Sequence, residues 1–299
     1  MTDPAIAILP YGRRLGGRLA RLPVEALIWP LGCPERLRGA QVGDMTRDDH
    51  LLVYPRTDIH FRINTGTRAR ISLIMAEPAV IHGRHLRLLR LSWRRFHRIL
   101  TFNEELLNAV PNAVLFPLGT TWVPEWRELT FAKTAMCSLI ASEKRDSQGH
   151  KLRHAMVDWV RSSSQDVAVM GRGYTPFAAK ADGLAPYRYS IVIENVRETN
   201  YFSEKLVDAV LCNTVPIYWG CPNLERFMNP EGIIRCDSEA EMRRAVAAMS
   251  EADFAARLPH LRRLQGELEP YIDIEKRAAR AILQSLPQAG DRAAADVTL

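Results

Sequence analysis

Short runs of apolar, often β-branched residues recur along the chain, separated by Pro, Gly, Asn and charged clusters. Runs of this length and composition are typical of buried strands. The first series comprises Ala5–Leu9, Ala26–Leu31, Leu51–Tyr54, Ile71–Met75, Ile99–Phe102 and Ala113–Phe116. The second comprises Met136–Ala141, Asp166–Met170, Ser190–Ile193, Val215–Tyr218 and Ile233–Cys236. The pattern therefore predicts two groups of strands.

Helix-like stretches lie between these strands. They are Leu86–Phe96, Leu152–Arg161, Glu204–Leu211 and Glu239–Met249. Strands that alternate with helices predict parallel sheets with helices on their faces, an α/β fold. The stretch Thr120–Lys133 has little periodicity, and we interpret it as a hinge between two α/β domains, 1–125 and 126–285, that face a cleft. The tail, 286–299, has no apolar face, and we expect it to be disordered.

The composition of the chain indicates where the protein is located and what kind of partner it binds. The chain of 299 residues has 47% hydrophobic residues, but no apolar run approaches the ~20 residues that span a bilayer. Its first residues lack the apolar core of a signal peptide. The five cysteines are odd in number and widely spaced, which predicts reduced thiols and a cytoplasmic location. The net charge of +6 favours a polyanionic partner without choosing between nucleic acid, anionic lipid and a diphosphate.

The segment Tyr187–Gly220 carries the clearest chemistry. It predicts a buried strand, a polar loop, a helix from Glu204 and a second buried strand. Ser203 is placed to cap that helix, and Lys205 adds a positive charge to the unpaired N–H groups of its first turn. This arrangement predicts a phosphate site. The alternative is an ordinary capped helix with a solvated Glu–Lys pair.

The same segment resembles the signature of glycosyltransferase family ten, the α1,3/α1,4-fucosyltransferases. The matching positions are Tyr187, Tyr189, Glu194, Asn195, Tyr201, Ser203, Glu204, Lys205, Asp208, Thr214, Val215, Pro216 and Gly220. The following run from Cys221 to Ile234 resembles the bacterial branch of the family. So many positions at fixed spacing are a stronger signal than a lone glycine motif.

The resemblance implies a GT-B fold, with two Rossmann-like domains and the donor bound by the C-terminal one. It implies contacts from Glu204 to the donor ribose and from Lys205 to the diphosphate. Asn195 and Tyr201 are expected to line the donor site, whereas Glu194 matches the motif without an assigned contact.

Four further donor-site residues come from weaker matches upstream. Arg153 matches the family's diphosphate-binding Arg, with Arg145 as the alternative, although Ser142-Glu143 stands where Ser-Asn is usual. Gly171 and Gly173 form a glycine turn that allows close backbone approach. Lys180 matches a family lysine.

A general base must come from the other domain. Inverting transfer needs a carboxylate that takes the proton of the acceptor hydroxyl. Glu77 follows a predicted strand and precedes Pro78, which resembles the family's Glu-Ser-Pro or Glu-Asn pattern, so it is the candidate. A helix-cap or ion-pair role is the alternative. The implied reaction transfers fucose from GDP-fucose to an oligosaccharide or glycolipid acceptor. A relative that uses another nucleotide sugar, or one that binds sugar nucleotides without catalysis, stays open.

No cofactor or metal is expected. The chain has no Asp-x-Asp motif, and His150 and His154, one helical turn apart, lack an evident third ligand. Arg153 and Lys205 can offset the leaving-group charge instead.

A basic helix is the last feature. Arg84, Arg87, Arg90, Arg94, Arg95 and Arg98 are predicted on one side, and Leu86, Leu89, Trp93 and Phe96 on the other. One interpretation is a surface helix whose apolar side packs on the core. The other is that its arginines make a peripheral contact with anionic lipid at the inner membrane face. Nucleic acid is not an expected partner, because no nucleic-acid motif or aromatic platform is present.

Overall fold

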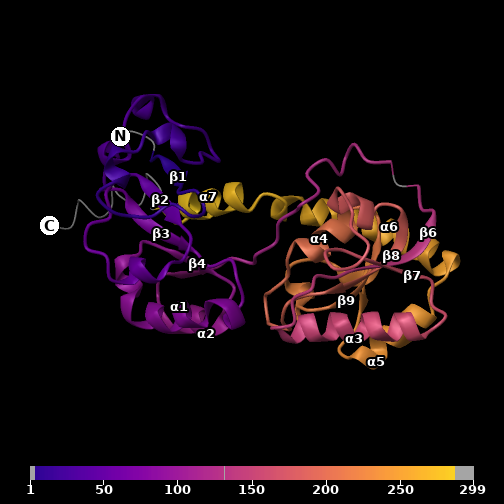
Figure 1. Cartoon of the computed structure of the whole chain (residues 1–299). Helices are drawn as coiled ribbons and strands as arrows, with labels where there is room; N and C mark the ends of the chain where they lie inside the picture. The colour runs from indigo at the N-terminus through magenta and orange to yellow at the C-terminus, as the bar shows by residue number, and fades with distance from the viewer. Residues whose placement is uncertain (1–3, 131, 287–299) are drawn as a thin grey trace.

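Two parallel five-stranded sheets form the core of the protein (Figure 1). The computed structural model describes residues 4–130 and 132–286. The strand orders are β1-β2-β3-β4-β5 and β10-β9-β8-β6-β7, and every paired strand in them is parallel. The predicted α/β class is confirmed.

The first sheet separates two apolar layers. Its strands are β1 (Ile6–Ile8), β2 (His50–Val53), β3 (Arg70–Ile74), β4 (Ile99–Thr101) and β5 (Ala113–Leu115). Because side chains alternate across a strand, Ala7 and Leu51 pack toward α1 (Ala79–Ser92) and α2 (Glu104–Ala109), while Ile8 and Leu52 pack toward α7 (Ile274–Gln284).

The strand predicted at Ala26–Leu31 is wrong. Val24–Ala26 is a 3₁₀ turn, and only Ile28 pairs with a strand, through reciprocal backbone hydrogen bonds of 2.9 and 3.0 Å with Ile8. Pro23 lies three residues before the run and Pro30 lies within it, and neither has an N–H to extend a ladder. The run therefore makes a single antiparallel bridge.

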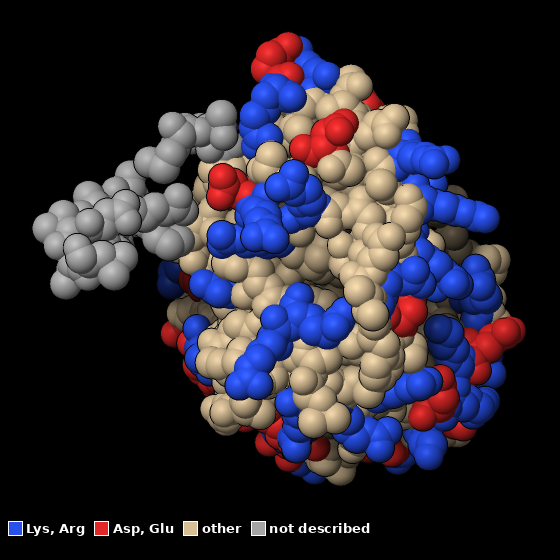
Figure 2. Space-filling view, turned by 90° about the vertical axis from the view of Figure 1, so that its left-hand side faces the viewer, with Lys and Arg blue, Asp and Glu red and all other residues tan. Residues whose placement is uncertain are grey.

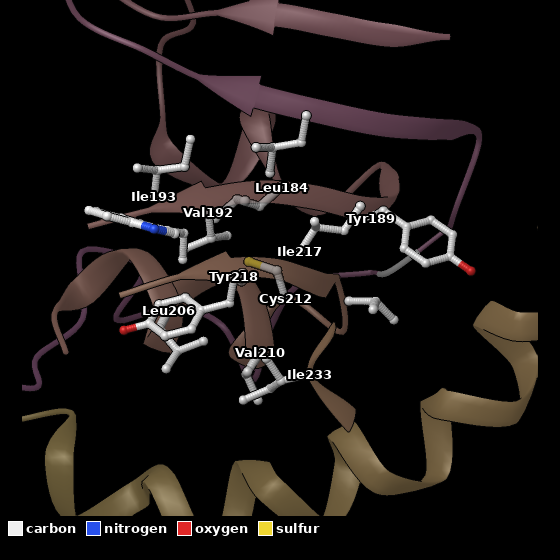
Figure 3. Close-up of a cluster of buried hydrophobic side chains, with 14 of the residues drawn as sticks. Leu184, Tyr189, Val192, Ile193, Leu206, Val210, Cys212, Ile217, Tyr218 and Ile233 are labelled. Atoms are coloured by element: carbon white, nitrogen blue, oxygen red, sulfur yellow. The ribbon is translucent and has the colours of Figure 1, made fainter. Parts of the chain in front are cut away.

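The second sheet holds the larger core. Its strands are β6 (Ala135–Ile140), β7 (Val167–Met170), β8 (Tyr187–Ile193), β9 (Val215–Trp219) and β10 (Ile234–Arg235). Helices α3 (Gln148–Ser162) and α5 (Glu239–Ala247) lie on one face, and α4 (Glu204–Leu211) and α6 (Glu251–Leu268) on the other (Figure 1). Figure 3 shows Ile217 and Val210 packed between the sheet and the helices.

The chain crosses between the domains twice. The predicted hinge leads from β5 to β6 without a helix or strand in its described residues, and the C-terminal chain returns so that α7 covers the first sheet (Figure 1). Thus α7, within the range expected for the second domain, contributes Ala278, Ala279 and Ile282 to the core of the first. The predicted tail lies outside the described residues from 287 onward.

The basic helix differs from its predicted limits. It starts at Ala79, directly after Pro78, and ends at Ser92, so Arg94 and Arg95 lie in a 3₁₀ turn. Arg98 lies outside the helix, where it donates a 3.1 Å hydrogen bond to the carbonyl of Ser285. The apolar side packs as predicted, with Leu89 and Phe96 buried.

Candidate functional site

A cavity of ≈ 570 Å³ opens at the carboxyl edge of the second sheet. Ligands of open α/β sheets bind at this edge. The predicted residues that line it are Gly171, Arg153, Lys180, Asn195, Glu204 and Lys205. It is also lined by residues that the sequence analysis did not single out, among them Trp122, Lys144 and Phe177, and by His150, which was considered there only as a metal ligand.

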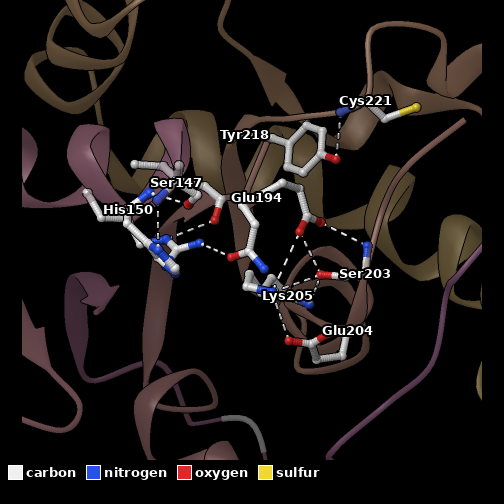
Figure 4. A network of polar contacts seen from close by, with 11 residues as sticks. Ser147, His150, Glu194, Ser203, Glu204, Lys205, Tyr218 and Cys221 are labelled. Atoms are coloured by element: carbon white, nitrogen blue, oxygen red, sulfur yellow. Dashed lines mark hydrogen bonds and ion pairs between the residues drawn. The ribbon is translucent and has the colours of Figure 1, made fainter. Parts of the chain in front are cut away.

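A buried polar network holds the start of α4 at this cavity (Figure 4). Glu194, fully buried at the end of β8, accepts hydrogen bonds from the Ser203 N–H at 2.8 Å and the Ser203 hydroxyl at 2.6 Å. Burial raises the pKa of Glu194 although Lys205, 3.7 Å away, lowers it. Glu194 does not line the cavity; it fixes the cap residue of the helix whose first turn does.

Glu204 and Lys205 form an ion pair on the cavity wall, with Lys205 Nζ 2.9 Å from Glu204 Oε1. Burial alone would raise the pKa of Glu204, but Lys205 and Lys180 outweigh it and the net shift is downward. Burial alone would lower the pKa of Lys205, but Glu204 and Glu194 raise it. Both side chains are therefore charged at neutral pH.

Arg153 lies beside this pair, buried on α3. Its Nε donates to the Ile193 carbonyl at 3.0 Å and its Nη2 to Asn195 Oδ1 at 2.8 Å. Burial lowers its pKa, whereas Glu194 raises it. No described residue accepts a hydrogen bond from Nη1, which leaves that end of the guanidinium for a ligand. Arg145 is exposed and does not line the cavity, so the geometry favours Arg153.

Gly149 is a site residue that the sequence analysis missed. Its N–H donates a 2.9 Å hydrogen bond to the carbonyl of Asn195, and a Cβ there would lie 1.7 Å from the Glu194 carbonyl. Only glycine lets α3 approach the end of β8 this closely. The sequence analysis began this helix at Leu152, so Gly149, which lies in the first turn of α3, fell outside its predicted range.

The glycine turn after β7 is tight for the expected reason. Gly171 has φ 113°, and a Cβ there would lie 2.1 Å from the Ala141 carbonyl. Gly171 lines the cavity, but Gly173, with φ 90°, is exposed and faces Glu143 instead.

Lys180 and Trp122 close another side of the cavity. Lys180 Nζ lies 5.5 Å from the ring centroid of Trp122, whose side chain is 62% exposed. Asp208 holds this part of the hinge: its Oδ1 accepts from the Thr121 hydroxyl at 2.6 Å and from the Trp122 N–H at 3.0 Å. Burial lowers the pKa of Lys180, against Asp208 and Glu204, which raise it.

Tyr201 is placed between the domains and does not line the cavity. Its ring centroid is 5.1 Å from that of Phe102, which follows β4. Nearby, the Asn200 amide donates to the Phe102 carbonyl at 3.2 Å, and Glu198 accepts from the Asn103 amide at 3.1 Å. This part of the second domain therefore docks on the carboxyl edge of the first sheet.

Glu77 follows β3 at that same edge. It is exposed, yet desolvation by the surrounding walls raises its pKa, Lys205 and Lys144 lower it, and Glu204 raises it further. Two residues further on, the Ala79 N–H donates a 3.4 Å hydrogen bond to Glu198 of the second domain, so Glu77 lies on the side of the first domain that faces the second.

Histidines near the cavity are engaged in hydrogen bonds. His150 Nδ1 pairs with Asp146 at 2.7 Å, and His154 bonds the Lys144 carbonyl at 3.0 Å and the Tyr174 hydroxyl at 2.7 Å. Within the described ranges, no group of three or more His, Cys, Asp or Glu side chains is arranged to hold a metal ion.

The second domain matches a known family. Residues 130–255 match the model described as glycosyltransferase family 10 (fucosyltransferase), C-terminal. The matched segment is 126 residues long, less than half of the chain. It contains the cavity's Arg153, Glu204 and Lys205, so the resemblance predicted from Tyr187–Gly220 is confirmed.

One protein sequence and one solved structure are also similar to the chain. The alpha-(1,3)-fucosyltransferase FucT of Helicobacter pylori is 34% identical over 55 residues, which are 18% of this chain and 12% of that protein. The chain thus matches about an eighth of this relative's length. A crystal structure of an alpha1,3-fucosyltransferase superposes with a TM-score of 0.50 at 16% identity, over 75% of this chain and 80% of the other. The latter supports the predicted GT-B arrangement of two α/β domains.

The helices carry no membrane-spanning segment in the described residues: none is both long and apolar enough.

Proposed function

We propose that the protein is an inverting glycosyltransferase that moves fucose from GDP-fucose to a hydroxyl of an acceptor glycan, in an α1,3/α1,4-type linkage. The family 10 domain and the name of the Helicobacter pylori relative support the reaction class. The observation that carries the proposal is that Arg153, Lys180 and Lys205 all line one cavity within the segment that matches the family.

In the proposed reaction, Glu77 accepts the proton of the acceptor hydroxyl while its oxygen attacks the anomeric carbon of the β-linked sugar. The bond from that carbon to the diphosphate breaks, and GDP leaves with the electron pair. Lys205, Lys180 and Arg153 lie around the cavity where the diphosphate charge would develop. Fixed cations in a desolvated site stabilise such a charge strongly. We further propose that these three cations make the reaction metal-independent.

Calorimetric titration tests the donor assignment. GDP and GDP-fucose should bind in EDTA with micromolar affinity, and GDP-mannose, UDP-sugars and TDP-sugars should bind at least tenfold more weakly. A preference for UDP would favour the alternative, a related transferase with another donor. Tight GDP binding without turnover on any glycan array would favour a non-catalytic relative.

We also propose that the enzyme works in the cytoplasm, peripheral to the membrane, on an oligosaccharide or glycolipid acceptor. The five cysteines of the chain are all free thiols, which favours a reducing compartment. On α1, Val80, Ile81 and Leu91 are 56%, 54% and 87% exposed and alternate with exposed arginines, the composition of an interfacial helix.

Flotation with vesicles tests the membrane contact. The protein should float with phosphatidylserine vesicles at low salt and stay behind with phosphatidylcholine alone. Replacement of Arg84 and Arg87 by Gln should abolish flotation, and replacement of the exposed Arg262 and Arg263 on α6 should not. Equal flotation with phosphatidylserine and phosphatidylcholine vesicles would contradict a contact between α1 and anionic lipid.

A further inference from the structure

A second group of side chains that could bind a ligand lies at the carboxyl ends of β1 and β2, outside the donor cavity. Strands β1, β2 and β3 are adjacent and parallel, so the loops after β1 and β2 lie on the same edge of the sheet as Glu77. Neighbouring strands are about 4.8 Å apart, which puts the loop after β1 roughly 10 Å from the end of β3. A sugar ring or two bridges that distance.

A tight turn presents the first of these side chains. The Arg13 N–H donates to the Pro10 carbonyl at 3.1 Å, and Gly12 at the third position has φ 91°, as a type II turn requires. Tyr11, at the second position, is 86% exposed. Its ring meets Tyr54, at the end of β2, edge to face with centroids 5.7 Å apart. Exposed aromatic rings of this kind are platforms for the apolar faces of sugars.

Arginines flank the two tyrosines. A small cavity of ≈ 40 Å³, floored by apolar side chains that include Leu9 and Val53, has Arg13 and Arg56 on its rim. Arg13 makes no ion pair with another described residue. Arg56 has only a distant carboxylate, Asp58, at 3.9 Å. The planar fork of a guanidinium pairs with carboxylate or phosphate oxygens through two parallel hydrogen bonds.

The net charge of the first domain also favours an anionic ligand. Residues 1–120 contain 17 arginines, no lysine and 10 acidic residues, a net charge of +7, so the rest of the chain is nearly neutral. Figure 2, which faces the left side of the molecule in Figure 1, shows blue side chains predominating there. A field of this sign attracts an anionic ligand before it docks.

We propose that the acceptor is an acidic glycan. Three observations support this: the paired rings of Tyr11 and Tyr54, the arginines Arg13 and Arg56 beside them, and the position of all four on the same edge of the sheet as Glu77. The sugar ring of the glycan lies on Tyr11 and its anionic group, a carboxylate or a phosphate, sits between Arg13 and Arg56. The inference rests on the proposed function for the meaning of acceptor. The acidic-sugar site itself stands on the first domain alone.

Saturation-transfer NMR on the full chain, with and without GDP, tests the proposal. The probes are a disaccharide ending in glucuronic acid, N-acetylglucosamine 1-phosphate, and neutral lactose. One or both acidic sugars should bind at least tenfold more tightly than lactose, and the stronger of them identifies the anion as carboxylate or phosphate. Arg13→Gln should remove most of that preference. Arg38→Gln, at an exposed arginine paired with Glu35 elsewhere in the same domain, should leave it unchanged.

Tyr11→Ala should weaken the binding of acidic and neutral sugars alike, because it removes the aromatic ring on which the sugar lies. Equal binding of lactose and both acidic sugars, or a preference that survives Arg13→Gln in a folded protein, would overturn the proposal. The GDP titration separates this result from the donor assignment: absence of GDP binding would count against the proposed transferase, whereas the sugar preference is read in the same sample without GDP.

Discussion

Glu194 and Ser203 are joined by two hydrogen bonds, from the Ser203 N–H at 2.8 Å and from its hydroxyl at 2.6 Å. Because Ser203 caps α4, this pair couples the end of β8 to the first turn of the helix that carries Glu204 and Lys205. The carboxylate has no exposed surface, so its role is to position the helix.

Glu194→Ala should therefore lower the free energy of unfolding by about 3 kcal/mol, because it leaves the N–H and the hydroxyl of Ser203 without their buried acceptor. GDP affinity should fall with it. Glu194→Gln retains one acceptor oxygen for Ser203 and should recover part of both. Urea unfolding and calorimetry measure the two effects, and an alanine variant that unfolds like the wild type would show that the pair does not hold the helix.

Gly149→Ala should destabilise the protein by about 2 kcal/mol or more, since its Cβ would lie 1.7 Å from the Glu194 carbonyl. Gly266→Ala, in α6 with no atom within 4 Å of the new Cβ, is the matched control. There the better helix propensity of Ala should stabilise by up to about 1 kcal/mol. Equal shifts of the melting temperature in the two variants would contradict the close approach of α3 to β8.

Asp208 should make stability depend on pH. Its carboxyl is fully buried, and burial raises its pKa from 3.8 to about 7. A raised pKa in the folded state contributes stability that is complete below pH 4 and is lost as the pH rises through 7. Asp208→Asn keeps an oxygen for Thr121 and Trp122 without the charge, so at pH 8 it should be more stable than the wild type, on the order of a few kcal/mol. A stability difference that stays constant between pH 5 and pH 8 would refute this origin.

Lys205→Ala should weaken GDP binding at least tenfold, because it removes a cation whose charge is held by Glu204 and Glu194. Lys205→Arg keeps the charge and should lose less. Lys151→Ala, at an exposed position of α3 that does not line the cavity, serves as the control for net charge. If Lys151→Ala weakened GDP binding as much as Lys205→Ala, the loss of affinity would come from the net charge of the protein and not from a contact of Lys205 with GDP.

The sequence predicted the second domain better than the first for a physical reason. The segment that carries Glu204 and Lys205 is local: one strand, one loop and one helix bring its residues together. The first domain has no such local signature, and its run at Ala26–Leu31, which contains Pro30, resembles a strand although it makes only a single bridge. Interactions between distant segments, such as Asp208 with Trp122 and Tyr201 with Phe102, leave no periodic signal in either partner.

The most direct test of the proposed reaction is the rate of GDP release from GDP-fucose by Glu77→Gln, measured with an acceptor glycan and set beside the affinity of the variant for GDP. Glu77 is exposed and follows β3, so the substitution should leave the fold intact. The rate should fall by about 10²–10⁴-fold, the contribution of a general base, while GDP affinity changes little. In the wild type, the rate should fall as the pH drops through the pKa of Glu77, which desolvation by the surrounding atoms raises above 4.5, because a protonated carboxyl cannot accept the proton. A Glu77→Gln enzyme with near-normal turnover and the same acid limb would contradict the account.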